Sequence, residues 1–196
     1  MKKQFIYRSV ILVALFAIVA GSCKKKEPKE DFSDVKGNYF SINQFIVDQW
    51  NNFPGPTCVM VKNVRVNNVT VDSGFTNTDT FSLAPVFKTF RESDISDRKF
   101  LGKYKFTQFD DPQDATHNFF YQAEDDELFT QKLLITLDMY NMKVRGIYIE
   151  TFKKTALDEC TQKLYYSPLK TIQIQTDDKP VFGKRKHTVA NYDFMR

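Results

Sequence analysis

The chain has 196 residues, with 28 basic and 24 acidic side chains and a formal charge of +4. Three of the basic residues, Lys2, Lys3 and Arg8, lie in the first 22 residues, which contain no acidic residue, so the remainder has 25 basic against 24 acidic groups. This balance excludes the basic excess that is typical of nucleic-acid-binding proteins, and we expect no nucleic-acid partner.

Residues 1–22 have the pattern of a secretory signal peptide. The basic start is followed by an uninterrupted apolar run over residues 10–20, which is a typical length for the hydrophobic region of such a signal. A membrane-spanning helix needs about 20 apolar residues, so the run is too short to predict one. The small residues Ala20, Gly21 and Ser22 then precede Cys23, and three lysines follow it.

This Ala20-Gly21-Ser22-Cys23 segment resembles a bacterial lipobox, with Ala20 where that pattern usually has leucine. Together with the lysines it resembles the start of small Bacteroidota lipoproteins, many of unknown function. The resemblance implies a palmitate-type lipid on Cys23 and an outer membrane lipoprotein of the cell envelope, facing the periplasm or the cell surface. The alternative is cleavage by the ordinary signal peptidase, which would leave Cys23 as a free N-terminal thiol.

Two further segments follow the signal. Residues 23–36 are rich in Lys, Glu and Asp, which predicts a charged flexible tether. Residues 37–196 are expected to form a single globular domain that can bury a core without a disulfide or a metal. With Cys23 lipidated, Cys58 and Cys160 remain either as a disulfide that closes a loop of about 100 residues or as two separate buried thiols.

Two helices are predicted near the start of the domain. The first begins at Ser41, because Ser41 and Gln44 have the spacing of a capping box, and it ends before Pro54-Gly55-Pro56. The second covers about residues 84–93, with Pro85 in its first turn. Each has an apolar face at helical spacing, formed by Ile42, Phe45, Ile46, Trp50 and Phe53 in the first helix and by Val86, Phe87 and Phe90 in the second.

Strand patterns dominate the rest of the domain. Residues 58–66 and 69–72 read as strands joined by a tight turn at Asn67-Asn68, and a loop over residues 72–80 follows. From Lys103 onward, apolar side chains alternate with polar ones in successive short runs. We therefore expect an α+β fold, a curved antiparallel β-meander of about seven or eight strands packed against one or two N-terminal helices.

Two acidic clusters are candidate cation sites. Asp110, Asp111 and Asp114 form one, and residues 124–127 form the other. In a meander they would lie at opposite ends of the sheet, and neither has EF-hand spacing. We therefore interpret both as turns and predict no metal site and no cofactor.

The histidines and a basic run are the remaining candidates. His117 and His187 are the only histidines, both at predicted strand starts, and no catalytic or nucleotide-binding motif accompanies them. The run of residues 184–187, Lys-Arg-Lys-His, is consistent either with contact to anionic lipid head groups or an acidic partner, or with a solvated loop.

These patterns favour a non-enzymatic, lipid-anchored protein that binds a partner protein or an apolar ligand. The alternative is an envelope enzyme that uses His117 or His187 with nearby carboxylates. A cavity lined by Phe and Tyr on one sheet face would indicate an apolar ligand. A sheet packed solid against the helices would favour a protein partner.

Overall fold

The computed structural model describes residues 39–51, 59–77 and 84–195. All of them lie within one unit of the chain, Val35–Arg196. The helices and strands of the described residues are, in chain order, α2 (Ile42–Asn51), β1 (Val59–Val66), β2 (Val69–Asn77), α3 (Ala84–Glu92), the 3-10 helix η3 (Arg98–Phe100), β3 (Tyr104–Asp111), β4 (Thr116–Ala123), β5 (Thr130–Asp138), β6 (Val144–Lys154), β7 (Asp158–Ser167), β8 (Thr171–Pro180) and β9 (Lys186–Met195).

The strands form one antiparallel sheet in the order β2-β1-β9-β8-β7-β6-β5-β4-β3. Strands β3 to β9 form a meander in which each strand pairs with the next along the chain. The predicted α+β fold with an antiparallel sheet is therefore confirmed. The predicted count of seven or eight strands is wrong, because the β1–β2 hairpin joins the same sheet beside β9 and brings the described strands to nine.

The β1–β2 hairpin turns where the sequence predicts it. Asn67 and Asn68 have φ values of 49° and 67°, in the left-handed region that asparagine tolerates better than most residues. Strand β2 then continues to Asn77, although residues 72–80 were expected to form a loop. The polar side chains that suggested a loop are tolerated because β2 is an edge strand, and Asp72 pairs there with Lys62 of β1 at 2.6 Å.

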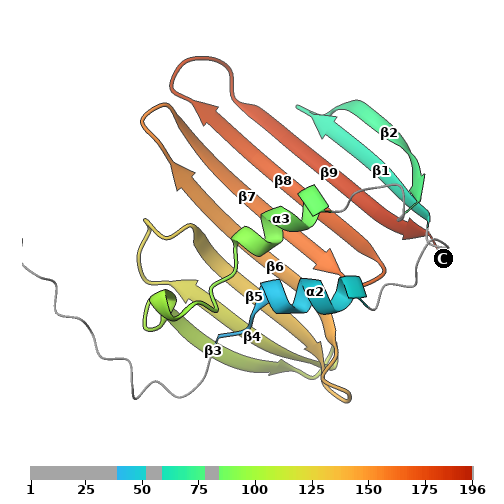
Figure 1. Cartoon of the computed structure of the whole chain (residues 1–196), viewed down its shortest axis with the longest axis vertical. Helices are drawn as coiled ribbons and strands as arrows, with labels where there is room; N and C mark the ends of the chain where they lie inside the picture. The colour runs from blue at the N-terminus through green and yellow to red at the C-terminus, as the bar shows by residue number, and fades with distance from the viewer. Residues whose placement is uncertain (1–38, 52–58, 78–83, 196) are drawn as a thin grey trace, which may run out of the picture. The chain divides into compact units, whose positions relative to one another are not determined.

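Both α-helices lie over the same face of the sheet (Figure 1). They occur where they were predicted, and their apolar faces are buried, as Ile42 and Ile46 of α2 and Phe87 and Phe90 of α3 show. The side chain of Trp50 and all of Phe53 lie outside the described residues. No helix among the described residues is long and apolar enough to cross a membrane.

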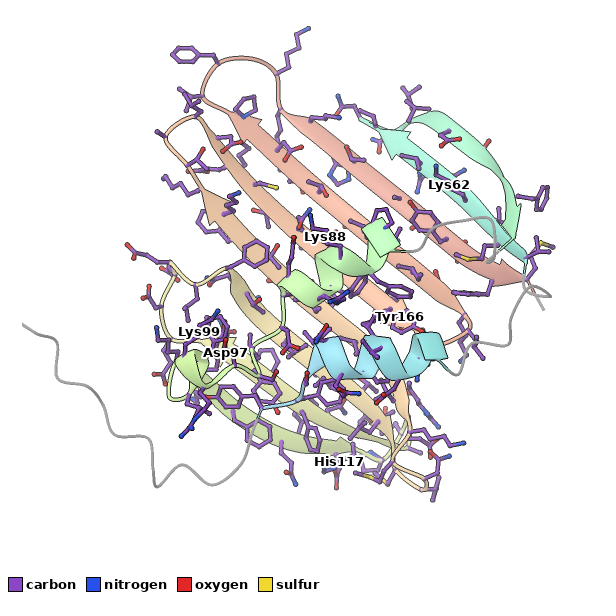
Figure 2. The ribbon with its side chains drawn as sticks, viewed as in Figure 1. Lys62, Lys88, Asp97, Lys99, His117 and Tyr166 are labelled. Carbon is purple, nitrogen blue, oxygen red and sulfur yellow. The ribbon has the colours of Figure 1, made fainter. Side chains whose placement is uncertain are left out.

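Tyr166 of β7 lies at the centre of the packing between helices and sheet (Figure 2). Its ring centroid is 6.1 Å from that of Phe45, 5.6 Å from Phe87 and 6.2 Å from Phe90. Its hydroxyl is the only fully buried side-chain oxygen or nitrogen of the described residues that has no hydrogen-bond partner. Leucine and isoleucine side chains of strands β5 to β8 complete the core, namely Leu133, Ile135, Ile147, Ile149, Leu164 and Ile172.

Two of the buried tyrosines, Tyr166 and Tyr104, give a first prediction. Tyr166→Phe removes a hydroxyl without a partner, so the free energy of unfolding should stay the same or rise by up to about 1 kcal/mol. Tyr104→Phe is the matched control, because the Tyr104 hydroxyl donates to the Thr130 carbonyl at 2.9 Å. That variant should lose about 1 kcal/mol. Urea unfolding of both variants measures the difference, and a larger loss for Tyr166→Phe would show that its hydroxyl has a partner in solution.

Candidate functional site

One polar hollow that the described residues form is a cleft of about 820 Å³. The start of α2, the last turns of α3 and the segment around η3 form its walls, and Figure 2 labels Lys88, Asp97 and Lys99 in this region. Polar and charged side chains dominate its lining, which consists of Asn43, Lys88, Arg91, Glu92, Asp94, Ser96, Asp97, Lys99 and Phe100. We refer to it as the charged cleft.

Asp94 joins the two sides of the charged cleft. Its Oδ2 accepts from the Ser41 hydroxyl at 2.9 Å and from the Asn43 backbone N–H at 2.7 Å. Its Oδ1 accepts from the Ser96 backbone N–H at 2.8 Å. The half-buried carboxylate therefore satisfies an orphan N–H of the first turn of α2 while it also holds its own loop.

Half of the predicted capping box is present. The Gln44 N–H donates to the Ser41 hydroxyl at 3.1 Å, as expected. The Gln44 side chain does not return to Ser41 but donates to Asp48 at 2.8 Å. Asp94 supplies the second cap instead, from 53 positions further along the chain.

The charged cleft carries both signs of charge at short range. Lys88 lies 3.6 Å from Glu92, and Lys99 lies 3.5 Å from Asp97. The Arg91 Nε donates to the Asn43 side chain at 2.7 Å. The Lys99 backbone N–H donates to Asp97 and, more than any other contact, lowers the pKa of that carboxyl. Such a surface can bind a charged or zwitterionic segment, but no histidine or cysteine lines it.

A second hollow, of about 930 Å³, lies beside the β4–β5 turn and the end of β6. Phe129 and Phe152 contribute apolar surface, and Glu92 borders both hollows. Its remaining lining residues are charged: Asp126, Glu127, Lys153 and Lys154.

Each histidine pairs with one aspartate on the neighbouring strand. His117 of β4 lies directly opposite Asp110 of β3, and its Nδ1 contacts that carboxylate. His187 of β9 lies directly opposite Asp177 of β8, with 3.1 Å between Nδ1 and Oδ1. Both histidines are at strand starts, as predicted, but neither lines a described hollow.

The two histidine–aspartate pairs are too far apart to act together. Strands β4 and β9 are five strand positions apart in the sheet, which corresponds to about 24 Å. His117 alternates in phase with the buried Tyr121, whereas His187 alternates out of phase with the buried Tyr192, so the two rings lie on opposite sheet faces.

The Asp177 carboxylate is the electrostatic centre of its pair. Burial works against its charge, but hydrogen bonds from His187 and Arg185 outweigh this effect and lower the pKa of Asp177. Arg185 lies 3.0 Å from the same oxygen. These contacts stabilise the charged form of Asp177. The carboxylate thereby links β8 to β9 and to the loop before it.

The two acidic clusters behave as turns. Asp111 accepts the Gln113 backbone N–H at 3.0 Å, and Asp125 accepts that of Glu127 at 2.8 Å. The clusters lie at opposite ends of β4, as predicted. Within the described ranges, no three His, Cys, Asp or Glu side chains form a group that could hold a metal.

Of the three cysteines, only Cys160 lies within the described residues. Cys23 and Cys58 lie outside the described residues, and Cys160 of β7 forms no disulfide with any described residue. Burial first, and then a hydrogen bond with Asp178, raises the pKa of the Cys160 thiol to about 12. The disulfide stays a prediction.

From the strand register of the described residues we expect two separate thiols, with the disulfide as the alternative. Cys160 lies level with Asp178 and Lys186, whereas Val59, the residue after Cys58, lies level with Met195. Lys186 and Met195 are nine positions apart on β9, which corresponds to about 30 Å. A disulfide requires Cα atoms within about 7 Å.

Comparisons with known proteins found no relative of this chain: no family model, no curated protein and no solved structure matches it.

The residues of the charged cleft were not predicted from the sequence. The only local signal for them is the run of Asp94, Ser96 and Asp97 directly after an amphipathic helix.

The role of Asp94 can be tested by stability. Asp94→Ala removes the acceptor of three hydrogen bonds, two of which join the start of α2 to the loop after α3. The free energy of unfolding should therefore fall by about 1–3 kcal/mol. Glu92→Ala, which breaks only the exposed pair with Lys88, should change it by less than about 0.5 kcal/mol. Equal losses in urea unfolding would contradict the assigned role.

The thiol content of the mature chain gives another test. We expect both Cys58 and Cys160 to react with iodoacetamide when the Cys23→Ser protein is unfolded in denaturant without a reductant. Intact-mass spectrometry then reads two adducts, and the Cys160→Ser variant serves as the control with one. Zero adducts before reduction and two after it would establish the disulfide.

Proposed function

We propose that this chain is a non-enzymatic, lipid-anchored protein of the cell envelope that binds a protein partner at the charged cleft. The observation that carries the partner class is the mixed charge of that cleft, where Lys88, Arg91 and Lys99 lie among Glu92, Asp94 and Asp97. A surface of this kind suits a polypeptide segment with charges of both signs and does not suit a lipid tail.

The anchor part of the proposal rests on the sequence. The signal-like residues 1–22 lead to Cys23, and a charged stretch separates it from the domain. Residues 23–36 number fourteen, which corresponds to a reach of up to about 50 Å when fully extended. A domain held on such a tether can meet partners well away from the bilayer surface.

The absence of catalysis is supported by the histidine geometry. A general base needs a reacting group within hydrogen-bond distance. His117 and His187 instead each contact one aspartate of the neighbouring strand, outside the described hollows. In both pairs the carboxylate is directly opposite in the strand register, as in an ordinary cross-strand pair.

A protein partner is favoured over an apolar ligand because the face between helices and sheet is filled. Ile42, Phe90 and Tyr166 are fully buried there, and the rings of both helices contact Tyr166 directly. One observation favours the apolar ligand as a second candidate. The unpartnered Tyr166 hydroxyl could donate to a single polar atom of a ligand that entered between α2 and α3.

Metabolic labelling tests the anchor. In bacterial cells that express the full chain, an alkyne analogue of palmitate should label the wild type and should not label Cys23→Ser. Cys160→Ser is the matched control and should label like the wild type. An unlabelled wild type whose mature mass begins at a free cysteine would contradict the lipid anchor.

Site-specific photocrosslinking in cells tests the partner site. A photoreactive amino acid at Lys99 should give one discrete adduct, and the double variant Lys88→Glu, Arg91→Glu should reduce that adduct at least about fivefold. The same amino acid at exposed Lys170, on the β7–β8 turn, is the control and should not give it. An adduct of equal yield from Lys170 would contradict a specific site.

Native mass spectrometry separates the two candidates. The Cys23→Ser chain, purified from bacterial membranes and cytosol, should carry no small molecule. A retained lipid that is lost from Tyr166→Phe, while Tyr104→Phe keeps it, would replace the protein partner by the apolar ligand.

A further inference from the structure

We infer that the loops at the β6–β7 and β8–β9 ends of the sheet form a second membrane contact, which inserts apolar side chains into an anionic bilayer surface. This contact is independent of the lipid on Cys23 and of the charged cleft. The apolar side chains that it inserts take part in no hydrogen bond and no catalytic arrangement described above.

The two loops form one apolar tip. Both lie at the same end of the sheet (Figure 1), and the Val181 backbone N–H donates to the Leu157 carbonyl at 2.8 Å. Leu157, Val181 and Phe182 are 69%, 61% and 86% exposed. These three large apolar side chains lie at the end of two joined hairpins and do not pack in the core. Such an exposed apolar group indicates an interaction site.

The loop backbones hold the tip in place. Thr155 closes the β6–β7 turn, since its N–H donates to the Asp158 carbonyl at 2.8 Å and its hydroxyl accepts from the Leu157 N–H at 3.2 Å. In the other loop, Gly183 has a φ of +122°, a conformation that only glycine adopts at low cost. The exposed side chains thus project from ordered turns.

Basic residues surround the tip and outnumber the acidic ones. Six of them lie in or beside the two loops, namely Lys153, Lys154, Lys179, Lys184, Arg185 and Lys186. Four acids lie nearby, namely Asp158, Glu159, Asp177 and Asp178. Two of them are in ion pairs, because Glu159 pairs with Lys154 at 2.8 Å and Asp177 with Arg185 at 3.0 Å. Lys179, Lys184 and Lys186 have no ion pair within 4 Å among the residues that the structure describes, so they are available for phosphate groups.

An anionic bilayer is the occupant that fits this arrangement. Phenylalanine and leucine tips partition into the boundary between head groups and acyl chains, while lysine and arginine around them attract anionic lipids. A convex tip of only three apolar side chains is small for a stable protein interface. A lipid anchor on the same chain would hold the tip near the surface, so a weak contact would be sufficient.

Vesicle cosedimentation of the Cys23→Ser mature chain tests the inference without the anchor. Binding should be measurable with vesicles of phosphatidylglycerol and phosphatidylcholine and should weaken with added salt. Phe182→Asp and Leu157→Asp should each weaken it at least about tenfold. The matched control is Phe75→Asp, which alters another exposed phenylalanine, 74% exposed, on the edge strand β2 and should bind like the wild type.

The basic residues are tested by the pair Lys184→Glu, Lys186→Glu, which should weaken binding to anionic vesicles at least about tenfold. The control Lys143→Glu, Lys170→Glu makes the same change in net charge on the β5–β6 and β7–β8 turns and should have a smaller effect. Circular dichroism confirms that each variant is folded.

Three outcomes would overturn the inference. They are no binding of the wild type at millimolar anionic lipid, equal binding of Phe182→Asp and wild type, and an equal loss in Phe75→Asp. If an added acidic protein prevents the wild type from cosedimenting with the vesicles, the tip has a protein partner instead. None of these results bears on the palmitate labelling or on the charged cleft.

Discussion

The pairing of β1 with β9 is the constraint that joins the N-terminal hairpin to the meander and so makes one continuous sheet. Eight residue pairs join the two strands, from Val59↔Met195 to Val66↔Thr188, across more than 120 positions of sequence. Two hydrogen bonds between Asn67 and His187 close one end of this pairing. The Asn67 N–H donates to the His187 carbonyl at 2.8 Å, and the Asn67 side chain accepts from the His187 N–H at 2.9 Å. Without this pairing the hairpin would be a two-stranded ribbon, which is marginal in water.

Local features of the fold could be predicted from the sequence, and features that join distant segments could not. The Asn67-Asn68 turn, the Ser41 helix start and the alternating strands depend on neighbouring residues, whose conformational preferences are visible in a short window. The length of β2 and the role of Asp94 depend on partners elsewhere in the chain. Asp72 looks like a loop residue until Lys62 is placed beside it on the neighbouring strand.

The candidate site follows the same division. The sequence could identify His117 and His187 as the only histidines, but their aspartate partners follow from strand register. The charged cleft was missed because its wall residues come from two helices and a loop, and each alone has the composition of an ordinary solvated surface. Only the packing of both helices on one sheet face brings these charges together.

The position of β9 also sets the order in which the sheet can be completed. A chain that is synthesised or exported from its N-terminus forms the β1–β2 hairpin first, yet the strand that receives this hairpin is the last one described. The six strands from β3 to β8 can add one after another, each by a short turn, while the hairpin waits. Loss of β9 would therefore split the sheet internally into two strands and six, which exposes two new edges instead of trimming one.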